Sequence, residues 1–186
     1  MDANKPNDND DSNELKKLSS GMIIIAWLLL LGLLTLFFSN WLDKQRNPNQ
    51  QIMSHMGSDG IREVSLQRNR YGHYNASGHI NGYEVEFMLD TGASDIAIPA
   101  HIADQIGLQR GLASSYRTAN GNITAYATRL DQVELGGIVM KNIRASINPS
   151  MDGEEILLGM SFLKKLEFTQ SGKILTLKQY VHQTVE

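Results

Sequence analysis

The chain has 186 residues, 41% of them hydrophobic, and a formal net charge of −3. This length suits one modest folded domain with accessory segments, and the slightly acidic balance offers no basic surface for nucleic acid. The lack of cysteine excludes disulfides, thiolate metal sites and a cysteine nucleophile. The five histidines are scattered without an HExxH-type pairing, so we expect no metal site.

The N-terminal part of the chain divides into a tail and an apolar run. Residues 1–20 are polar, and the first dozen are rich in Asn and Asp, which predicts a disordered tail. Residues 21–40 contain the uncharged run Gly21–Ser39, long enough as a helix to span about 30 Å of hydrocarbon. We interpret residues 21–40 as a transmembrane signal anchor, with Trp41 at the membrane interface.

A cleaved secretory signal is the competing interpretation of this run. Signal peptides have an apolar stretch of roughly 7–15 residues that ends in a small-x-small site. The run here is longer and ends in Phe37-Phe38-Ser39-Asn40-Trp41, which favours an uncleaved anchor. The balance of nearby Lys and Arg on the two sides gives a slight bias toward a cytoplasmic N-terminus, and so toward a domain outside the cytoplasm.

Residues 41–62 are polar and contain the breakers Pro48, Gly57 and Gly60. This composition predicts a flexible linker between the membrane and a folded domain. Its length and polarity also suggest that cleavage within it could release the domain.

The segment 63–178 has the pattern of an all-β domain, followed by a tail at 179–186. Apolar residues alternate with Glu along Tyr83–Leu89, which indicates a strand with one buried face. Asn81-Gly82 before it suits a two-residue hairpin turn, because both turn positions need positive φ. Strands recur with turn signals about every ten residues, which predicts a sandwich or barrel. Further turns are expected at Asn120-Gly121, Gly136-Gly137 and Ser171-Gly172, and two short helices at Pro99–Ile106 and Ser161–Lys165.

The strand Tyr83–Leu89 runs directly into Asp90-Thr91-Gly92-Ala93-Ser94. This order places a carboxylate at the end of a rigid strand. Thr91 and Ser94 can hydrogen-bond around it, Ser94 to the carboxylate itself, and Gly92 permits close approach of backbone or substrate. Asp and Gly also close ordinary turns, so the triplet gains its weight from its apolar lead-in and from a second motif.

The second motif is Ile156–Leu163, an apolar strand that ends at a glycine and passes into a short helix. Three pieces in order, LDTGAS at 89–94, TANGNITAY at 118–126 and LLGMSFL at 157–163, resemble the retropepsin-like aspartic peptidases, in particular their small membrane-anchored bacterial members. The resemblance covers about residues 64–178. We expect the residues of LLGMSFL to pack rather than to react.

The resemblance implies a closed retropepsin-like β-barrel with one or two short helices. It makes Asp90 the catalytic residue, with Thr91, Gly92 and Ser94 supporting the active-site loop. Ala119, Asn120 and Gly121 correspond to the tip of a flap that closes over a peptide or protein substrate. Together with the apolar run and its slight charge bias, the resemblance to bacterial members predicts a single-pass protein of the inner membrane with a periplasmic domain.

Aspartic peptidases activate water between two carboxylates about 3 Å apart that share one proton, without metal or cofactor. This sequence holds a single Asp-Thr-Gly. The simplest solution is a two-fold homodimer in which each chain contributes Asp90. A membrane anchor would favour it by raising the effective concentration of the two copies.

Two other functions compete with the peptidase. One is a catalytically inactive peptidase-like domain that binds peptides or signals at the membrane, although the complete Asp90–Ser94 motif argues against it. The other is an unrelated hydrolase. No Gly-x-Ser-x-Gly elbow exists, since Gly92-Ala93-Ser94-Asp95-Ile96 lacks the closing glycine.

Overall fold

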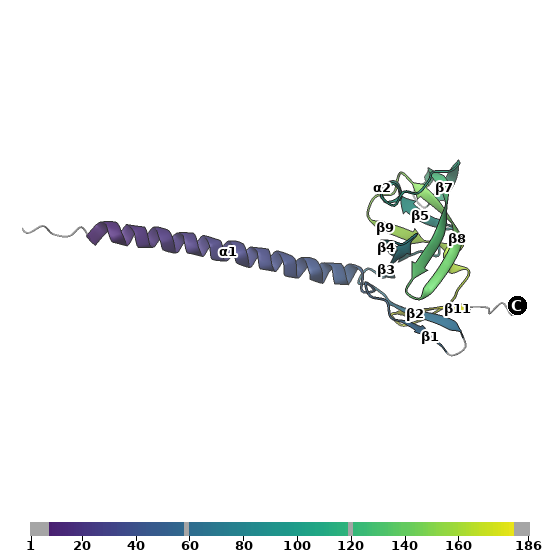
Figure 1. Ribbon diagram of the computed structural model, residues 1–186, viewed down its shortest axis with the longest axis horizontal. Coiled ribbons are helices and arrows are strands. Elements are labelled where there is room, and N and C mark those ends of the chain that lie inside the picture. Colours follow the sequence, from purple (N-terminus) through teal and green to yellow (C-terminus); the bar gives the residue numbers. More distant parts are fainter. Residues whose placement is uncertain (1–7, 58–59, 119–120, 181–186) are drawn as a thin grey trace, which may run out of the picture. The chain divides into compact units, whose positions relative to one another are not determined.

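The computed structural model describes residues 8–57, 60–118 and 121–180, and its contacts divide the chain into two units, Met1–Asp43 and Lys44–Glu186. The first unit holds most of helix α1 (Asp8–Arg46), drawn in purple and blue in Figure 1. The part Gly21–Arg46 is long and apolar enough to cross a membrane, and its large apolar side chains are exposed. A signal sequence near the N-terminus can meet the same criterion of length and composition.

Helix α1 begins well before the apolar run. Residues 8–20, which we expected to be disordered, are helical, while residues 1–7 of that predicted tail lie outside the described residues. The stretch Glu14–Leu18 consists of residues with high helix propensity. The apolar helix that follows supplies the nucleus from which a helix propagates at little cost. The prediction of disorder is therefore wrong for residues 8–20.

The predicted linker at 41–62 is also wrong over most of its length, because residues 47–56 are part of the second unit. Asn47 and Asn49 are buried. The Asn49 side chain donates hydrogen bonds to the carbonyl oxygens of Gln67 at 2.9 Å and Asn75 at 2.6 Å, and accepts one from the Gln67 N–H at 2.7 Å. The sequence of a polar, Pro-containing segment does not show whether its hydrogen bonds are made with water, as in a linker, or with the protein, as here.

Replacing Asn49 with alanine is expected to lower the free energy of unfolding by roughly 2–3 kcal/mol, because buried backbone groups lose their partners. Gln50→Ala, an exposed neighbour, is the matched control. Urea unfolding followed by the β-sheet signal in circular dichroism measures the difference. Equal midpoints for the two variants would show that the segment is a dispensable linker.

The second unit is built mainly of strands, with two short helices. Its elements are β1 (Ser54–Met56), β2 (Ile61–Gln67), β3 (Asn75–Ile80), β4 (Tyr83–Leu89), β5 (Ile96–Pro99), α2 (Ala100–Gln105), β6 (Ala113–Thr118), β7 (Gly121–Leu135), β8 (Ile138–Asn148), β9 (Glu155–Leu158), α3 (Met160–Leu163), β10 (Glu167–Ser171) and β11 (Ile174–Tyr180).

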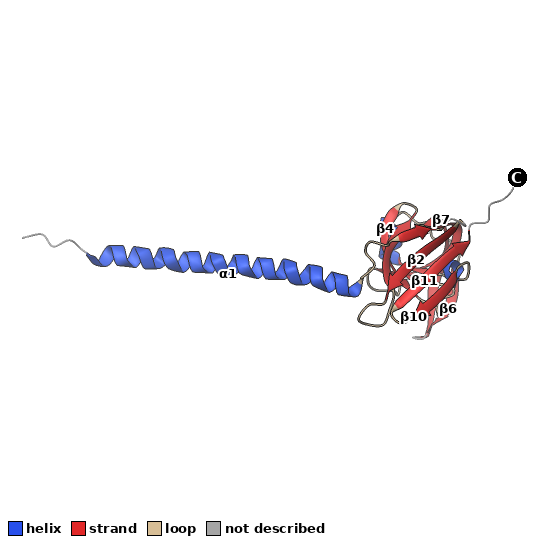
Figure 2. Cartoon of the chain, turned by 90° about the horizontal axis from the view of Figure 1, so that it is seen from below, coloured by secondary structure: helices blue, strands red, loops and turns tan. Residues whose placement is uncertain are grey.

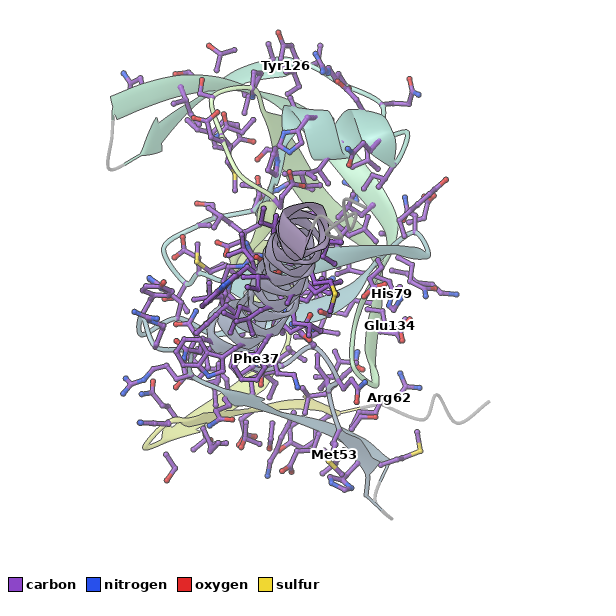
Figure 3. The ribbon with its side chains drawn as sticks, turned by 90° about the vertical axis from the view of Figure 1, so that its left-hand side faces the viewer. Phe37, Met53, Arg62, His79, Tyr126 and Glu134 are labelled. Carbon is purple, nitrogen blue, oxygen red and sulfur yellow. The ribbon has the colours of Figure 1, made fainter. Side chains whose placement is uncertain are left out.

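One sheet closes on itself. Its strand order is β3-β4-β9-β5-β8-β7-β6, and an additional pairing of β3 with β7 joins the ends of the first six strands into a ring. Figure 3 labels His79 and Glu134, which pair at this junction. The predicted turn residue Asn81 reinforces it, exchanging hydrogen bonds with the backbone of Gln132 on β7. The closed β-fold expected from the sequence is thus present.

A second sheet of four antiparallel strands, in the order β1-β2-β11-β10, packs on the same hydrophobic core. Figure 2 shows β2, β11 and β10 side by side. Val64, Leu66 and Leu177 from this sheet are fully buried together with Phe87 and Phe162 from around the ring. One core therefore supports both sheets and holds β4 and β9, the strands that lead into the candidate site.

Most of the predicted turns are confirmed. Asn81 and Gly82 have φ of 51° and 85° and connect β3 to β4. The Gly136-Gly137 turn joins β7 to β8, and β10 is joined to β11 by a turn at Gly172-Lys173, one residue later than predicted. Both predicted helices are present, one of them, α2, beginning directly after Pro99. The domain extends slightly beyond its predicted limits, from Lys44 to the end of β11, and residues 181–186 lie outside the described part.

Candidate active site

Asp90 lies directly after β4, between two neighbouring strands that fix the backbone on both sides. The N–H of Leu89 donates to the carbonyl of Tyr74 at 3.0 Å, and the N–H of Asp90 donates to the carbonyl of Leu158 at 3.2 Å. Along β4, Val85 and Phe87 are buried, as the alternation predicted. Asp90 itself is half-buried. The backbone hydrogen bonds thus hold the half-buried Asp90 carboxylate in a fixed position at the end of β4.

The residues after Asp90 fold back around its side chain. Asp90 Oδ1 accepts a hydrogen bond from the N–H of Gly92 at 2.8 Å, and the Asp90 carbonyl accepts one from Ala93 at 3.3 Å. A Cβ on Gly92 would lie 3.1 Å from Asp90 Oδ1, closer than most such contacts. Thr91 and Gly92 are exposed. Because Gly92 has no side chain, the Asp90 carboxylate stays open to solvent on the side facing position 92.

The segment from β9 to α3 supports the loop from beneath. Met160 N–H donates to the Ala93 carbonyl at 2.8 Å, and Ser161 N–H donates to the Ser94 carbonyl at 2.9 Å. A Cβ on Gly159 would lie 2.2 Å from the carbonyl oxygen of Asp95, so only glycine fits there without displacement. Phe162 and Leu163 are buried in the core, which confirms the packing expected of this motif.

Ser161 is a loop-supporting residue that the sequence did not reveal. Its hydroxyl oxygen accepts a hydrogen bond from the Ile96 N–H at 3.1 Å, and its own N–H holds Ser94. Ser94 was expected to bond the Asp90 carboxylate. The bond described for that carboxylate comes from Gly92, and Ser94, which is exposed, joins the loop through its carbonyl.

A second carboxylate of the loop, Asp95, is buried and was also missed. Arg144 Nε donates to Asp95 Oδ1 at 2.7 Å, and the Tyr116 hydroxyl donates to Asp95 Oδ2 at 3.4 Å. Burial, and next the nearby Asp95 charge, raise the pKa of Tyr116 above its ordinary value. The hydrogen bond to Asp95 raises the pKa of Arg144. At neutral pH both groups therefore remain proton donors to Asp95.

The predicted flap corresponds to the hairpin of β6 and β7. Thr118 pairs with Gly121, so the strands are joined through positions 119 and 120. Ala119 and Asn120, two of the three expected flap residues, lie outside the described residues. Gly121 begins β7 with a φ of 111°, a conformation that favours glycine. The hairpin is present, and its contact with substrate stays a prediction.

A cavity of about 360 Å³ opens beside Asp90 and Thr91. The other lining residues come from the segment just before β3, from the end of β4, from α3 and from strands β10 and β11. The hydroxyl of Tyr74 is buried there without a hydrogen-bond partner among the described residues. The remaining lining is mostly apolar: Leu89, Leu163, Phe168, Gln170, Leu175 and Leu177.

This chain is similar in sequence and fold to known aspartic proteases. Residues 76–165 match the family model described as "gag-polyprotein putative aspartyl protease". The crystal structure of a retropepsin-like aspartic protease from Rickettsia conorii is 30% identical, with a TM-score of 0.52, and the match covers 69% of this chain and 95% of that one.

Two curated relatives, both uncharacterized proteins, match as well. One, encoded in the cobV 5′ region of a Sinorhizobium species, is 35% identical over 116 residues, which is 61% of this chain and 50% of the relative. The other, from Rickettsia prowazekii (strain Madrid E), is 32% identical over 133 residues, 69% of this chain and 56% of the relative. The chain thus spans about half the length of each. With the Rickettsia conorii protein matched almost throughout, this chain belongs to the retropepsin-like aspartic protease family.

Proposed function

We propose that the chain is an aspartic endopeptidase in which Asp90 supplies one of two carboxylates that activate a water molecule. The observation that carries the proposal is the half-buried Asp90, fixed at a strand end and held in a loop that Gly159 and Ser161 support. The ionised carboxylate takes a proton from water, which attacks the peptide carbonyl, and the protonated partner donates a proton to the carbonyl oxygen.

The second carboxylate is proposed to be Asp90 of another copy. Among the described residues that line the cavity, Asp90 is the sole acid. The other carboxylate of the loop, Asp95, is already bonded to Arg144 and Tyr116. A two-fold dimer would bring the two Asp90 side chains together, where two like charges about 3 Å apart share one proton.

The four-stranded sheet offers the surface for this second copy. Its edge strand β10 has five exposed residues, with Phe168 46% exposed at the mouth of the cavity beside Asp90. The unpaired backbone of an edge strand readily pairs with another chain. We therefore place the dimer contact at β10 and the cavity.

We also propose that helix α1 anchors the chain in a membrane. The apolar side chains of α1 from Met22 to Leu42 are exposed, a distribution that suits lipid. We propose a single-pass protein of the bacterial inner membrane with the β domain in the periplasm. Full-length chain that resists extraction from membranes by alkaline carbonate would support the anchor. A mature chain that begins after residue 40 would indicate a cleaved signal instead.

The shared site predicts a particular result when active and inactive chains are mixed. Adding an equal amount of Asp90→Asn chain to wild type in detergent, with time for exchange, should halve the peptide cleavage, because half of the wild-type chains then pair with an inactive partner. A site complete in one chain would keep its full activity. Cleavage of a fluorogenic peptide library measures the difference.

Phe168→Arg tests the surface itself. A charge on β10 should weaken the dimer by about tenfold or more, so activity per chain should fall at low concentration and recover at high concentration. Leu112→Arg changes an equally apolar side chain, 83% exposed and outside β10, and serves as the control. Unchanged self-association of the Phe168→Arg chain would rule out this surface.

A further inference from the structure

Three side chains from separate elements meet beside the candidate site: Asp95 of the loop, Arg144 of β8 and Tyr116 of β6. Asp95 is 6% exposed, so its charge requires partners within the protein. Arg144 Nε, at 2.7 Å, is the strong partner, while the Tyr116 hydroxyl, at 3.4 Å, is a long and weak one. The two contacts therefore have different roles.

The Asp95–Arg144 pair belongs to the rigid frame. The residue before Asp95 is held by the N–H of Ser161, and the N–H of the residue after it, Ile96, donates to the Ser161 hydroxyl. Ile96 then pairs with Ala145, the neighbour of Arg144 on β8. Both members of the ion pair are thus fixed by adjacent strands of the closed ring, which leaves Asp95 as an immobile acceptor.

Tyr116 belongs to a much less restrained element. Strand β6 is the last strand in its sheet, and among the described residues its ladder is formed with β7 alone. The hydroxyl of Tyr116 adds a contact from β6 to the active-site loop, independent of the backbone ladder with β7. A tyrosine hydroxyl is protonated at neutral pH, and burial and the nearby Asp95 charge raise the pKa of Tyr116 further, so it donates to Asp95.

We infer that Tyr116 is a positioning residue whose hydroxyl, through Asp95, holds the arm of the β6–β7 hairpin against the active-site loop. The inference rests on the proposed function, since the hairpin would cover the peptide bound at Asp90. A hairpin held in place before binding loses less conformational freedom when substrate arrives. The contact acts on substrate binding and leaves the proton transfers at Asp90 unchanged.

Tyr116→Phe removes the hydroxyl and keeps the ring. In the full chain in detergent, KM for a peptide substrate should rise roughly threefold to tenfold at nearly constant kcat. Hydrogen exchange at the backbone amides of β6 should accelerate by a similar factor in the free protein. Tyr126→Phe, on the other strand of the same hairpin, is the control, because its ring packs near Arg110 and the described hydrogen bonds of Asp95 come from Arg144 and Tyr116. Tyr126 is labelled in Figure 3.

The exchange measurement needs no turnover, so it separates this inference from the proposed function. A wild-type chain that cleaves no peptide would refute the peptidase proposal. Faster exchange in β6 of Tyr116→Phe, without a change in Tyr126→Phe, would still show that the Tyr116 hydroxyl holds the hairpin in place. Equal exchange and equal KM in the two variants would overturn the inference. A fall in kcat at unchanged KM would also overturn it, because it would place Tyr116 in the chemistry.

Discussion

Replacing Asp90 with asparagine is expected to abolish peptide cleavage, with a loss on the order of 10³-fold or more in kcat, because an amide cannot accept the proton of the attacking water. Stability should change little. Asp90 is half-buried, and its Oδ1 accepts one hydrogen bond, from Gly92, that the amide oxygen can also accept. The substitution therefore removes the proton acceptor and leaves the conformation of the loop unchanged.

The control for this prediction is Asp152→Asn, an exposed aspartate in the loop before β9. Initial rates on a peptide library and thermal unfolding of the same samples make the comparison. Cleavage that persists in Asp90→Asn at the wild-type rate would assign the reaction to other groups. A wild-type chain that binds peptides without cleaving them, with Asp90→Asn binding equally well, would favour the peptide-binding alternative.

Gly159→Ala is the second change with a large expected effect. Its new Cβ would lie 2.2 Å from the carbonyl oxygen of Asp95 and 2.6 Å from that of Ala93, and both oxygens belong to the backbone of the active-site loop. Neither can rotate away as a side chain could. The loop must shift, at a cost of about 3 kcal/mol in stability, and a displacement of this kind should reduce kcat/KM by on the order of 10²-fold.

Gly57→Ala is the matched control, since its Cβ would meet the carbonyl oxygen of Ile61 at an ordinary distance of 3.7 Å. Urea unfolding and cleavage rates of both variants test the prediction. Both tryptophans, Trp27 and Trp41, lie in α1, so unfolding of the β domain is better followed by circular dichroism than by tryptophan fluorescence. A stable and fully active Gly159→Ala chain would show that the loop tolerates movement.

The sequence predicted the local features of this fold because they depend on a few adjacent residues. Asn81-Gly82 specifies its hairpin through positive φ at both positions, and the alternation along Tyr83–Leu89 specifies the buried face of β4. Asp90 could be singled out because its strand, its loop and its glycine are contiguous and the separate motif Ile156–Leu163 completes the family resemblance. The β9–α3 motif was expected to pack, although its hydrogen bonds to Ala93 and Ser94 were not foreseen.

What sequence reasoning missed depends on partners distant along the chain. Nothing local to Asp95 distinguishes it from a solvated acid, because its partners Arg144 and Tyr116 come from β8 and β6. Asn49 likewise has the composition of a linker residue, yet it bonds the backbone of Gln67 and Asn75. In both cases the polar side chain is satisfied by a group that only the folded topology brings near.

The support of the active-site loop by residues near the far end of the domain has a consequence for biosynthesis. Leu89 pairs with Leu158 in parallel, and the loop is complete only when Gly159, Met160 and Ser161 pack beneath it. Pairings this distant in sequence form slowly, after the cost of closing a long loop. During translation, β4 and Asp90 emerge long before the strand that orders them. A nascent chain therefore cannot form the supported loop around Asp90 until β9 and α3 have been synthesised.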